Sequence, residues 1–126
     1  MEKQEIRTFG RRHGKKLSLR QSALIDNLLT TLRPTHGDIL EIGFGAGEHV
    51  RDLARANPGK IIIGAEPFMN GGASLLSAIT DEKTNCVLNE YAGIRIWPDD
   101  VRDFLRATDS KFEQIWVLHP DPWPKA

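Results

Sequence analysis

Short apolar segments alternate with segments of helical periodicity along most of this chain, and this alternation constrains the fold more than any other feature. Four segments have the length and the mainly apolar character of buried strands. They are residues 38–42, 61–65, 94–97 and 114–118. Helical spacing predicts helices over residues 18–32, 48–56, 73–79 and 101–107, whereas residues 81–93 match neither pattern. Strands that are apolar on both faces are typical of a parallel sheet covered by helices, so we expect an α/β fold.

The composition is that of one globular domain. The 126 residues carry 17 basic and 17 acidic side chains. Cys86 is the one cysteine and cannot form an internal disulfide, and no Cys/His cluster has the spacing of a zinc site. The longest apolar run is far shorter than the ~20 residues that a membrane span needs. No secretory signal follows Met1, so we expect a cytoplasmic protein that binds neither a metal nor a membrane.

Basic residues are concentrated at the start of the chain. Residues 1–20 carry seven Lys or Arg, among them Arg11 and Arg12, against two acidic residues, which leaves a charge of +5 here and −5 on the remainder. The segment lacks an apolar period, which predicts a flexible arm over residues 1–17 that orders on a polyanion such as nucleic acid. A solvated, frayed terminus is the alternative interpretation.

Polar residues follow each predicted strand. Glu41–Gly47, Glu66, Asp99 and Asp100, and Asp121 come at the ends of the four strands in chain order. The carboxyl ends of parallel strands meet at one edge of the sheet, where such folds bind their ligands. The sequence therefore predicts one crevice that is lined by acidic side chains.

The loop after the first strand is rich in glycine and begins with an acidic residue. Gly43, Gly45 and Gly47 follow Glu41 with the spacing G-x-G-x-G, whereas the dinucleotide fingerprint is G-x-G-x-x-G. A carboxylate at this loop would repel a pyrophosphate and attract a ligand that carries an ammonium or sulfonium group. S-adenosylmethionine is such a ligand. The alternative is a turn whose glycines serve close packing only.

Two further strand ends fit the same ligand. Glu66 can accept hydrogen bonds from both ribose hydroxyls of an adenosine, and Asp99 or Asp100 can accept one from the exocyclic amine of its adenine. For each of these residues, the alternative is an N-cap of the following helix.

The segment after the fourth strand combines three prolines with a carboxylate, an indole and an ammonium group. Trp123 could stack on a purine while Asp121 accepts hydrogen bonds from the N1–H and N2–H₂ of guanine. A proline-rich turn with a core tryptophan is the alternative interpretation.

Together these segments resemble the bacterial tRNA (guanine-N7)-methyltransferase family. The marks of that family are an Arg-rich start, a Glu-x-Gly-x-Gly-x-Gly loop and a Pro-Asp-Pro-Trp-x-Lys segment. They correspond here to residues 7–12, 41–47 and 120–125, with Gly64-Ala65-Glu66 between them. The resemblance covers nearly the whole chain and implies a Rossmann-like class I methyltransferase sheet that uses S-adenosylmethionine to methylate guanine 46 in the variable loop of tRNA.

The resemblance also implies roles for individual residues. Glu41, Glu66, Asp100 and Asp121 would form the cofactor and active site, with Asp100 favoured over its neighbour Asp99. Lys125 corresponds to a tRNA contact, and the basic arm would hold tRNA phosphates. Family members continue beyond the position of Ala126 and complete a seven-stranded sheet. Residues 18–126 are thus expected to form the first part of a methyltransferase domain, with residues 114–118 as an unpaired edge strand.

The implied reaction is a direct in-line methyl transfer to guanine N7, which needs no strong general base because N7 carries no proton. Asp121 would orient the guanine and stabilise its developing positive charge. Two alternatives are an amino-group methyltransferase of the adenine type and a shortened, non-catalytic module that binds S-adenosylmethionine or RNA. An NAD-dependent dehydrogenase fits the glycine spacing least.

Overall fold

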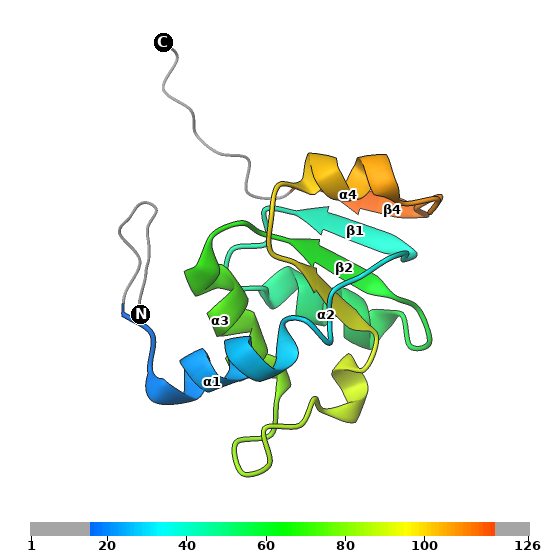
Figure 1. Ribbon diagram of the computed structural model, residues 1–126. Helices are drawn as coiled ribbons and strands as arrows, with labels where there is room; N and C mark the ends of the chain where they lie inside the picture. Colours follow the sequence, from blue (N-terminus) through cyan, green and yellow to red (C-terminus); the bar gives the residue numbers. More distant parts are fainter. Residues whose placement is uncertain (1–15, 118–126) are drawn as a thin grey trace.

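A computed structural model describes residues 16–117 of the chain (Figure 1). Helices and strands alternate along it as the sequence predicts. In chain order they are α1 (Leu19–Leu28), β1 (Ile39–Ile42), α2 (Glu48–Ala56), β2 (Ile62–Ala65), α3 (Met69–Ile79), the 3-10 helix η1 (Asn89–Tyr91), β3 (Ile94–Trp97), α4 (Val101–Ala107) and β4 (Gln114–Trp116). The expected α/β class is therefore confirmed.

The four strands form one parallel sheet in the order β3-β2-β1-β4. Ile39 in β1 pairs with Ile62 in β2 on one side and with Gln114 in β4 on the other. The chain thus moves outward from β1 to β3 and then returns to the far side of β1 for β4. This reversal beside β1 is the topological switch point at which open α/β sheets bind their ligands.

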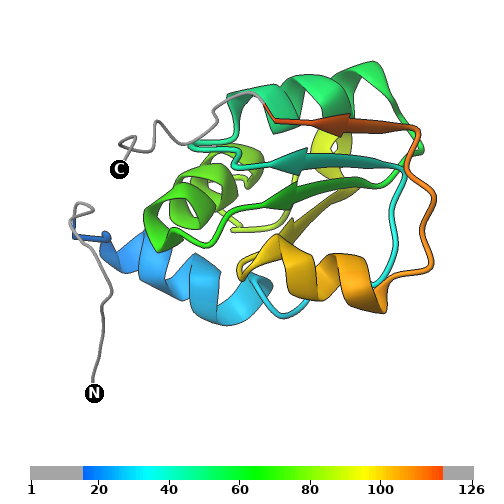
Figure 2. The ribbon, with the colours of Figure 1, turned by 90° about the horizontal axis from the view of Figure 1, so that it is seen from above.

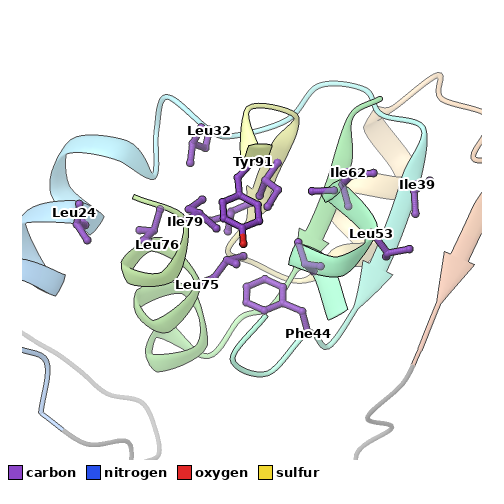
Figure 3. Close-up of a cluster of buried hydrophobic side chains, with 14 residues drawn as sticks. Leu24, Leu32, Ile39, Phe44, Leu53, Ile62, Leu75, Leu76, Ile79 and Tyr91 are labelled. Atoms are coloured by element: carbon purple, nitrogen blue, oxygen red, sulfur yellow. The ribbon is translucent and has the colours of Figure 1, made fainter. Parts of the chain in front are cut away.

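Helices cover both faces of the sheet, and Figure 2 shows α2 and α4 on opposite sides of the strands. One core cluster lies between the sheet and α1, α2 and α3, and most of its side chains are drawn in Figure 3. A smaller cluster on the other face joins Leu40 and Ile63 to Phe104 of α4. Successive side chains of a strand point to opposite faces of the sheet, so the adjacent residues Ile39 and Leu40 of β1 belong to different clusters.

The first helix begins where the sequence predicts and ends earlier. Ser18 accepts the backbone N–H of Gln21 at 3.1 Å, and the Gln21 side chain accepts the N–H of Ser18, which completes a capping box. The prediction that the helix reaches residue 32 is wrong, because α1 ends at Leu28. Leu32 is still buried, and its N–H bonds to the Leu28 carbonyl at 2.9 Å, while its own carbonyl accepts the N–H of Ile96 in β3 at 3.0 Å. Pro34, which has no N–H, follows two positions later and cannot continue a helix.

Two other boundaries differ from the prediction. Helix α3 starts at Met69 rather than at residue 73, so Gly71 and Gly72 lie inside its first turns. Strand β4 covers residues 114–116, and position 118 lies outside the described residues. Within the described part of the chain β4 pairs only with β1, and its Ile115 side chain is 57% exposed, which agrees with the expected edge strand.

Candidate cofactor site

The loops that follow the first three strands begin side by side. Gly43 N–H donates to the Ala65 carbonyl at the end of β2 (2.8 Å), and Glu66 N–H donates to the Trp97 carbonyl at the end of β3 (3.0 Å). The predicted meeting of polar strand ends is therefore confirmed for β1, β2 and β3. The start of α1 and the end of β4 lie on the side of the molecule toward which the strands point (Figures 1 and 2).

The three glycines of the loop all have left-handed backbone conformations, with φ of +72° at Gly43, +61° at Gly45 and +89° at Gly47. Residues with a side chain rarely adopt these φ angles, so the loop requires glycine at these three positions for conformational reasons. A Cβ on Gly45 would meet no atom within 4 Å, whereas a Cβ on Gly47 would lie 2.6 Å from Leu75. Gly47 thus serves close packing, and Gly45 faces open space in which a ligand can lie against the backbone.

The Glu66 carboxylate, directly after β2, is hydrogen-bonded to the glycine loop. Its Oε1 accepts the N–H of Gly45 at 3.0 Å, and its Oε2 accepts the N–H of Phe68 at 3.2 Å. Phe68, and not Glu66, is the N-cap of α3. Each carboxylate oxygen can accept more than one hydrogen bond, so these two contacts leave Glu66 with acceptor capacity for hydroxyl groups.

Helix α3 packs directly against the same loop through Gly71. A Cβ at this position would lie 2.4 Å from the Gly45 carbonyl oxygen and 2.9 Å from Cγ of Glu66. Sequence reasoning placed Gly71 near the start of a helix and missed this contact. Only the paired glycines in an otherwise apolar helix hint at a close approach.

Glu41 is completely buried, and its carboxylate contacts His49 in the first turn of α2. The Oε1 atom of Glu41 lies 2.9 Å from Nδ1 of His49, whose side chain is 25% exposed. The His49 ring packs edge-on against Trp116 of β4, with 4.7 Å between ring centroids. The sequence contains no signal for this pair, because the contact depends on how the glycine loop turns the start of α2 back over β1.

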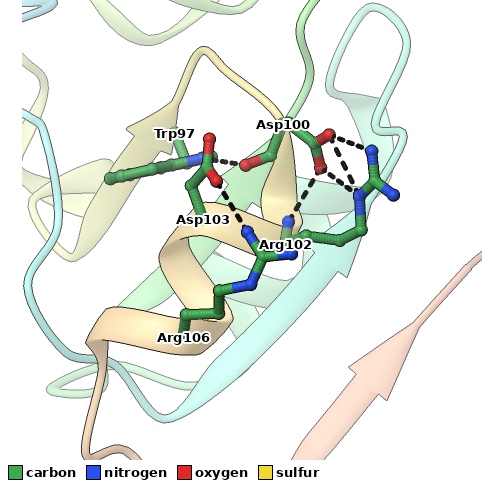
Figure 4. Close-up of polar contacts among 5 residues, drawn as sticks. All are labelled: Trp97, Asp100, Arg102, Asp103 and Arg106. Carbon is green, nitrogen blue, oxygen red and sulfur yellow. Dashed lines mark hydrogen bonds and ion pairs between the residues drawn. The ribbon is translucent and has the colours of Figure 1, made fainter.

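Asp100 takes the helix-capping role that the sequence left open as the alternative to a ligand contact. Its side chain accepts the backbone N–H of Arg102 at 2.9 Å and forms further hydrogen bonds with the guanidinium of the same residue (Figure 4). These bonds lower the pKa of the Asp100 carboxyl to about 2. Its proposed contact with adenine stays a prediction, and its carboxylate is already engaged with Arg102.

The neighbouring Asp99 has a different environment. It forms an ion pair with Arg33 at 2.9 Å, and both side chains are about half exposed. The Arg33 guanidinium carbon also lies 4.1 Å from the centre of the Trp97 ring. An exposed pair of this kind is weak and can exchange partners, so Asp99 remains available to a ligand at the end of β3.

Several predicted site residues lie outside residues 16–117. They are Arg11 and Arg12 in the basic arm, and Asp121, Trp123 and Lys125 after β4. Their roles stay predictions, as does the flexibility of residues 1–17 as a whole.

A cleft of about 520 Å³ opens at the other end of the strands, between the turn that follows α2 and the residues before β3. Its two cationic side chains are already paired with carboxylates, Arg55 with Asp52 and Lys60 with Glu113. It lies at the amino ends of β2 and β3, away from the glycine loop, so it is not the candidate cofactor site.

The described residues contain neither a cluster of metal ligands nor a membrane-spanning helix. Between residues 16 and 117, no group of three or more His, Cys, Asp or Glu side chains is arranged to hold a metal ion. No helix in this range has both the length and the apolar character that crossing a membrane requires.

Comparisons with known proteins relate the chain to methyltransferases. Residues 35–126 match the model of the Methyltransf_4 family, which is described as "Putative methyltransferase". Similar curated proteins occur in Hyphomonas neptunium (39% identical over 95% of this chain), Erythrobacter litoralis (39% over 94%) and Granulibacter bethesdensis (38% over 100%). Each of these relatives is named tRNA (guanine-N(7)-)-methyltransferase. The matches cover 59%, 54% and 60% of the respective relatives, so the chain spans somewhat over half of their length.

Proposed function

The chain belongs to this family of methyltransferases, and we propose that it takes part in the S-adenosylmethionine-dependent methylation of guanine N7 in tRNA. The substrate position that we propose is guanine 46 of the variable loop. The names of the relatives support guanine N7 and do not favour the amino-group alternative. A cytoplasmic location is part of the same proposal.

The observation that carries the proposal is the juxtaposition of two carboxylates with the glycine loop at one edge of the sheet. Glu41 is buried at the start of the loop, and Glu66 contacts its middle through Gly45 N–H at 3.0 Å. Two anionic groups beside this loop oppose a pyrophosphate and favour a ligand with positive charge and free hydroxyl groups. S-adenosylmethionine has a sulfonium, an ammonium and two ribose hydroxyls, so the residues present fit it.

Each carboxylate has a proposed contact. Glu41 would attract the ammonium group, Glu66 would accept the ribose hydroxyls, and the backbone at Gly45 would border the ligand. For the adenine amine we propose Asp99 ahead of Asp100, since the carboxylate of Asp100 caps α4. This order reverses the preference that the resemblance suggested.

Bound S-adenosylmethionine supplies a methyl group that is activated by its positively charged sulfur. Guanine N7 has a lone pair and no proton, so the protein needs to align N7 with the methyl carbon and does not need to remove a proton. We propose that Asp121 orients the guanine edge and stabilises positive charge on the purine, and that Trp123 stacks on the ring. Lys125, Arg11 and Arg12 would contact tRNA phosphates, so binding should weaken steeply with salt.

The proposal is tested by binding and by methylation. In calorimetry, Glu41→Gln and Glu66→Gln should each weaken S-adenosylmethionine binding about tenfold, as expected when a hydrogen bond to a charged group is lost. Asp109→Asn, which removes an exposed carboxylate elsewhere, should leave it unchanged. Transfer of labelled methyl groups to tRNA should require guanine 46 and be lost in Asp121→Ala.

Three outcomes would contradict the proposal in different ways. Binding of NAD without S-adenosylmethionine would indicate a dehydrogenase. Methylation of tRNA that lacks guanine 46 would refute the substrate position. Binding of S-adenosylmethionine and tRNA without any methyl transfer would indicate the non-catalytic module.

A further inference from the structure

Glu41, His49 and Trp116 form a continuous chain of contacts across three elements. Glu41 lies in β1, His49 in the first turn of α2 and Trp116 at the end of β4. Glu41 and Trp116 are opposite each other in the register of the parallel pair β1–β4. His49 lies over this pair, since it contacts the carboxylate of one residue and the ring of the other.

The contact with His49 matters for Glu41 because this carboxylate is fully buried. Removing an ionised carboxylate from water is costly unless hydrogen bonds replace the lost solvation. An ionised carboxylate only accepts hydrogen bonds, so the 2.9 Å contact between Nδ1 of His49 and Oε1 of Glu41 fits the ring tautomer that has its proton on Nδ1. A bond to a charged acceptor is stronger than a neutral one and fixes the direction of the carboxylate.

His49 is itself held in place from two sides. Its backbone belongs to the first turn of α2, which is positioned by Gly47 at φ +89°. Its ring meets Trp116 edge-on, with an angle of 67° between the two planes. The ring therefore contacts Trp116 and Glu41 at the same time, and the two contacts together favour one position of Nδ1 relative to β1.

We propose that His49 is a positioning residue for the amino-acid end of the cofactor, which acts by orienting the carboxylate of Glu41 toward the ammonium group. This inference rests on the proposed function, because it requires Glu41 to contact that ammonium. His49 touches neither the methyl donor nor the guanine in this proposal. Its effect is limited to ligands that carry the ammonium group.

That restriction separates positioning from a merely structural role. S-adenosylhomocysteine carries the ammonium, whereas methylthioadenosine has the same adenosine and sulfur but lacks the amino-acid end. If His49 only stabilised the fold, its loss would weaken both ligands by the same factor, since both depend equally on the folded fraction. The ratio of the two dissociation constants therefore reports on the positioning of Glu41 alone.

Two substitutions divide the functions of the ring. His49→Phe keeps an aromatic ring against Trp116 and removes the donor. His49→Asn removes the ring but keeps a donor, because the side-chain amide nitrogen of asparagine is separated from the backbone by the same number of bonds as Nδ1 of histidine. We expect the phenylalanine variant to weaken S-adenosylhomocysteine by about tenfold and the asparagine variant by less than threefold. Methylthioadenosine should change by less than twofold in both variants.

A second pair of measurements covers the case in which His49→Phe does not fold. His49→Gln keeps a donor that is one bond longer, so its ratio should fall between those of wild type and a variant without the donor. In a Glu41→Gln background, where no charge needs orientation, His49→Phe should leave the ratio unchanged. This background removes the buried charge and so favours a folded protein.

Calorimetry with the two ligands decides among the outcomes. An equal loss of both ligands in the His49 variants, or an unchanged ratio in His49→Phe and His49→Gln, would overturn the positioning role while the proposed function stands. Failure of wild type to bind either ligand would instead refute the proposed function, and the inference with it.

Discussion

Substitution of Gly71 by alanine tests whether α3 supports the glycine loop. The added Cβ would lie 2.4 Å from the Gly45 carbonyl oxygen, whereas real Cβ atoms keep at least 3.0 Å from other heavy atoms. The loop or the helix must therefore move by at least the difference of 0.6 Å. The loop cannot yield freely, because Gly45 N–H is bonded to Glu66 and Cγ of Glu66 is itself only 2.9 Å from the new atom.

Gly72 provides a matched control in the same helix. A Cβ on Gly72 would meet no atom within 4 Å, and neither glycine has a left-handed φ. Alanine is favoured over glycine in a helix by up to about 1 kcal/mol, so both variants gain this amount. Overpacking costs about 1–3 kcal/mol, and only Gly71→Ala incurs it. The free energies of unfolding of the two variants should thus differ by about 1–3 kcal/mol, with Gly72→Ala the more stable.

Urea unfolding followed by far-ultraviolet circular dichroism measures this difference directly. Calorimetry with S-adenosylmethionine should in addition show weaker binding for Gly71→Ala and unchanged binding for Gly72→Ala. Equal stability of the two variants, or a Gly71→Ala protein with wild-type affinity, would show that the contact between α3 and the loop does not constrain the site.

Three further predictions concern the helix ends. The pKa of the Asp100 carboxyl is about 2, below its usual 3.8, so the stabilisation that the ionised carboxylate provides is complete above pH 3.8 and is lost as pH falls through 2. A carbon-detected NMR titration of Asp100 should show a midpoint at about 2, and Arg102→Leu should raise this midpoint toward the usual value. Ser18→Ala removes the cap of α1 and should lower the free energy of unfolding by about 1 kcal/mol in urea titrations, while Ser18→Asp should retain most of it. Arg20 donates a hydrogen bond to the Thr80 hydroxyl at 2.8 Å, so Arg20→Leu should lower the free energy of unfolding by about 1 kcal/mol and raise the rate of amide hydrogen exchange in α1. Unchanged exchange would show that this hydrogen bond does not hold α1 in place.

Sequence patterns predicted the sheet well because its strands are short and mainly apolar, and three of the four, β1, β2 and β3, are largely buried. Strand β3 and helices α2 and α4 have the predicted bounds, and the two internal strands of the sheet, β1 and β2, begin one residue later than expected. The error at the end of α1 coincides with a tertiary contact that the local pattern does not contain. Leu32 keeps helical spacing in the sequence, and its N–H bonds to the Leu28 carbonyl, but its own carbonyl bonds to Ile96 of β3.

The site was predictable only in part. The glycine loop and the meeting of strand ends follow from spacing and topology alone. His49 and Gly71 could not be found in this way, since their contacts depend on how α2 and α3 lie against the loop. For Asp100 the sequence could not decide between two roles, because an acidic residue between a strand and a helix can either cap the helix or contact a ligand, and in the structure it caps α4.

The pairing of β1 with β4 also bears on how the protein is made. Ile39 pairs with Ile62 after 23 positions but with Gln114 only after 75. During synthesis on the ribosome, one side of β1 therefore stays open until the fourth strand has emerged from the exit tunnel. An open strand edge invites mispairing with other nascent chains, so slow translation of the segment before β4 should lower the yield of native protein.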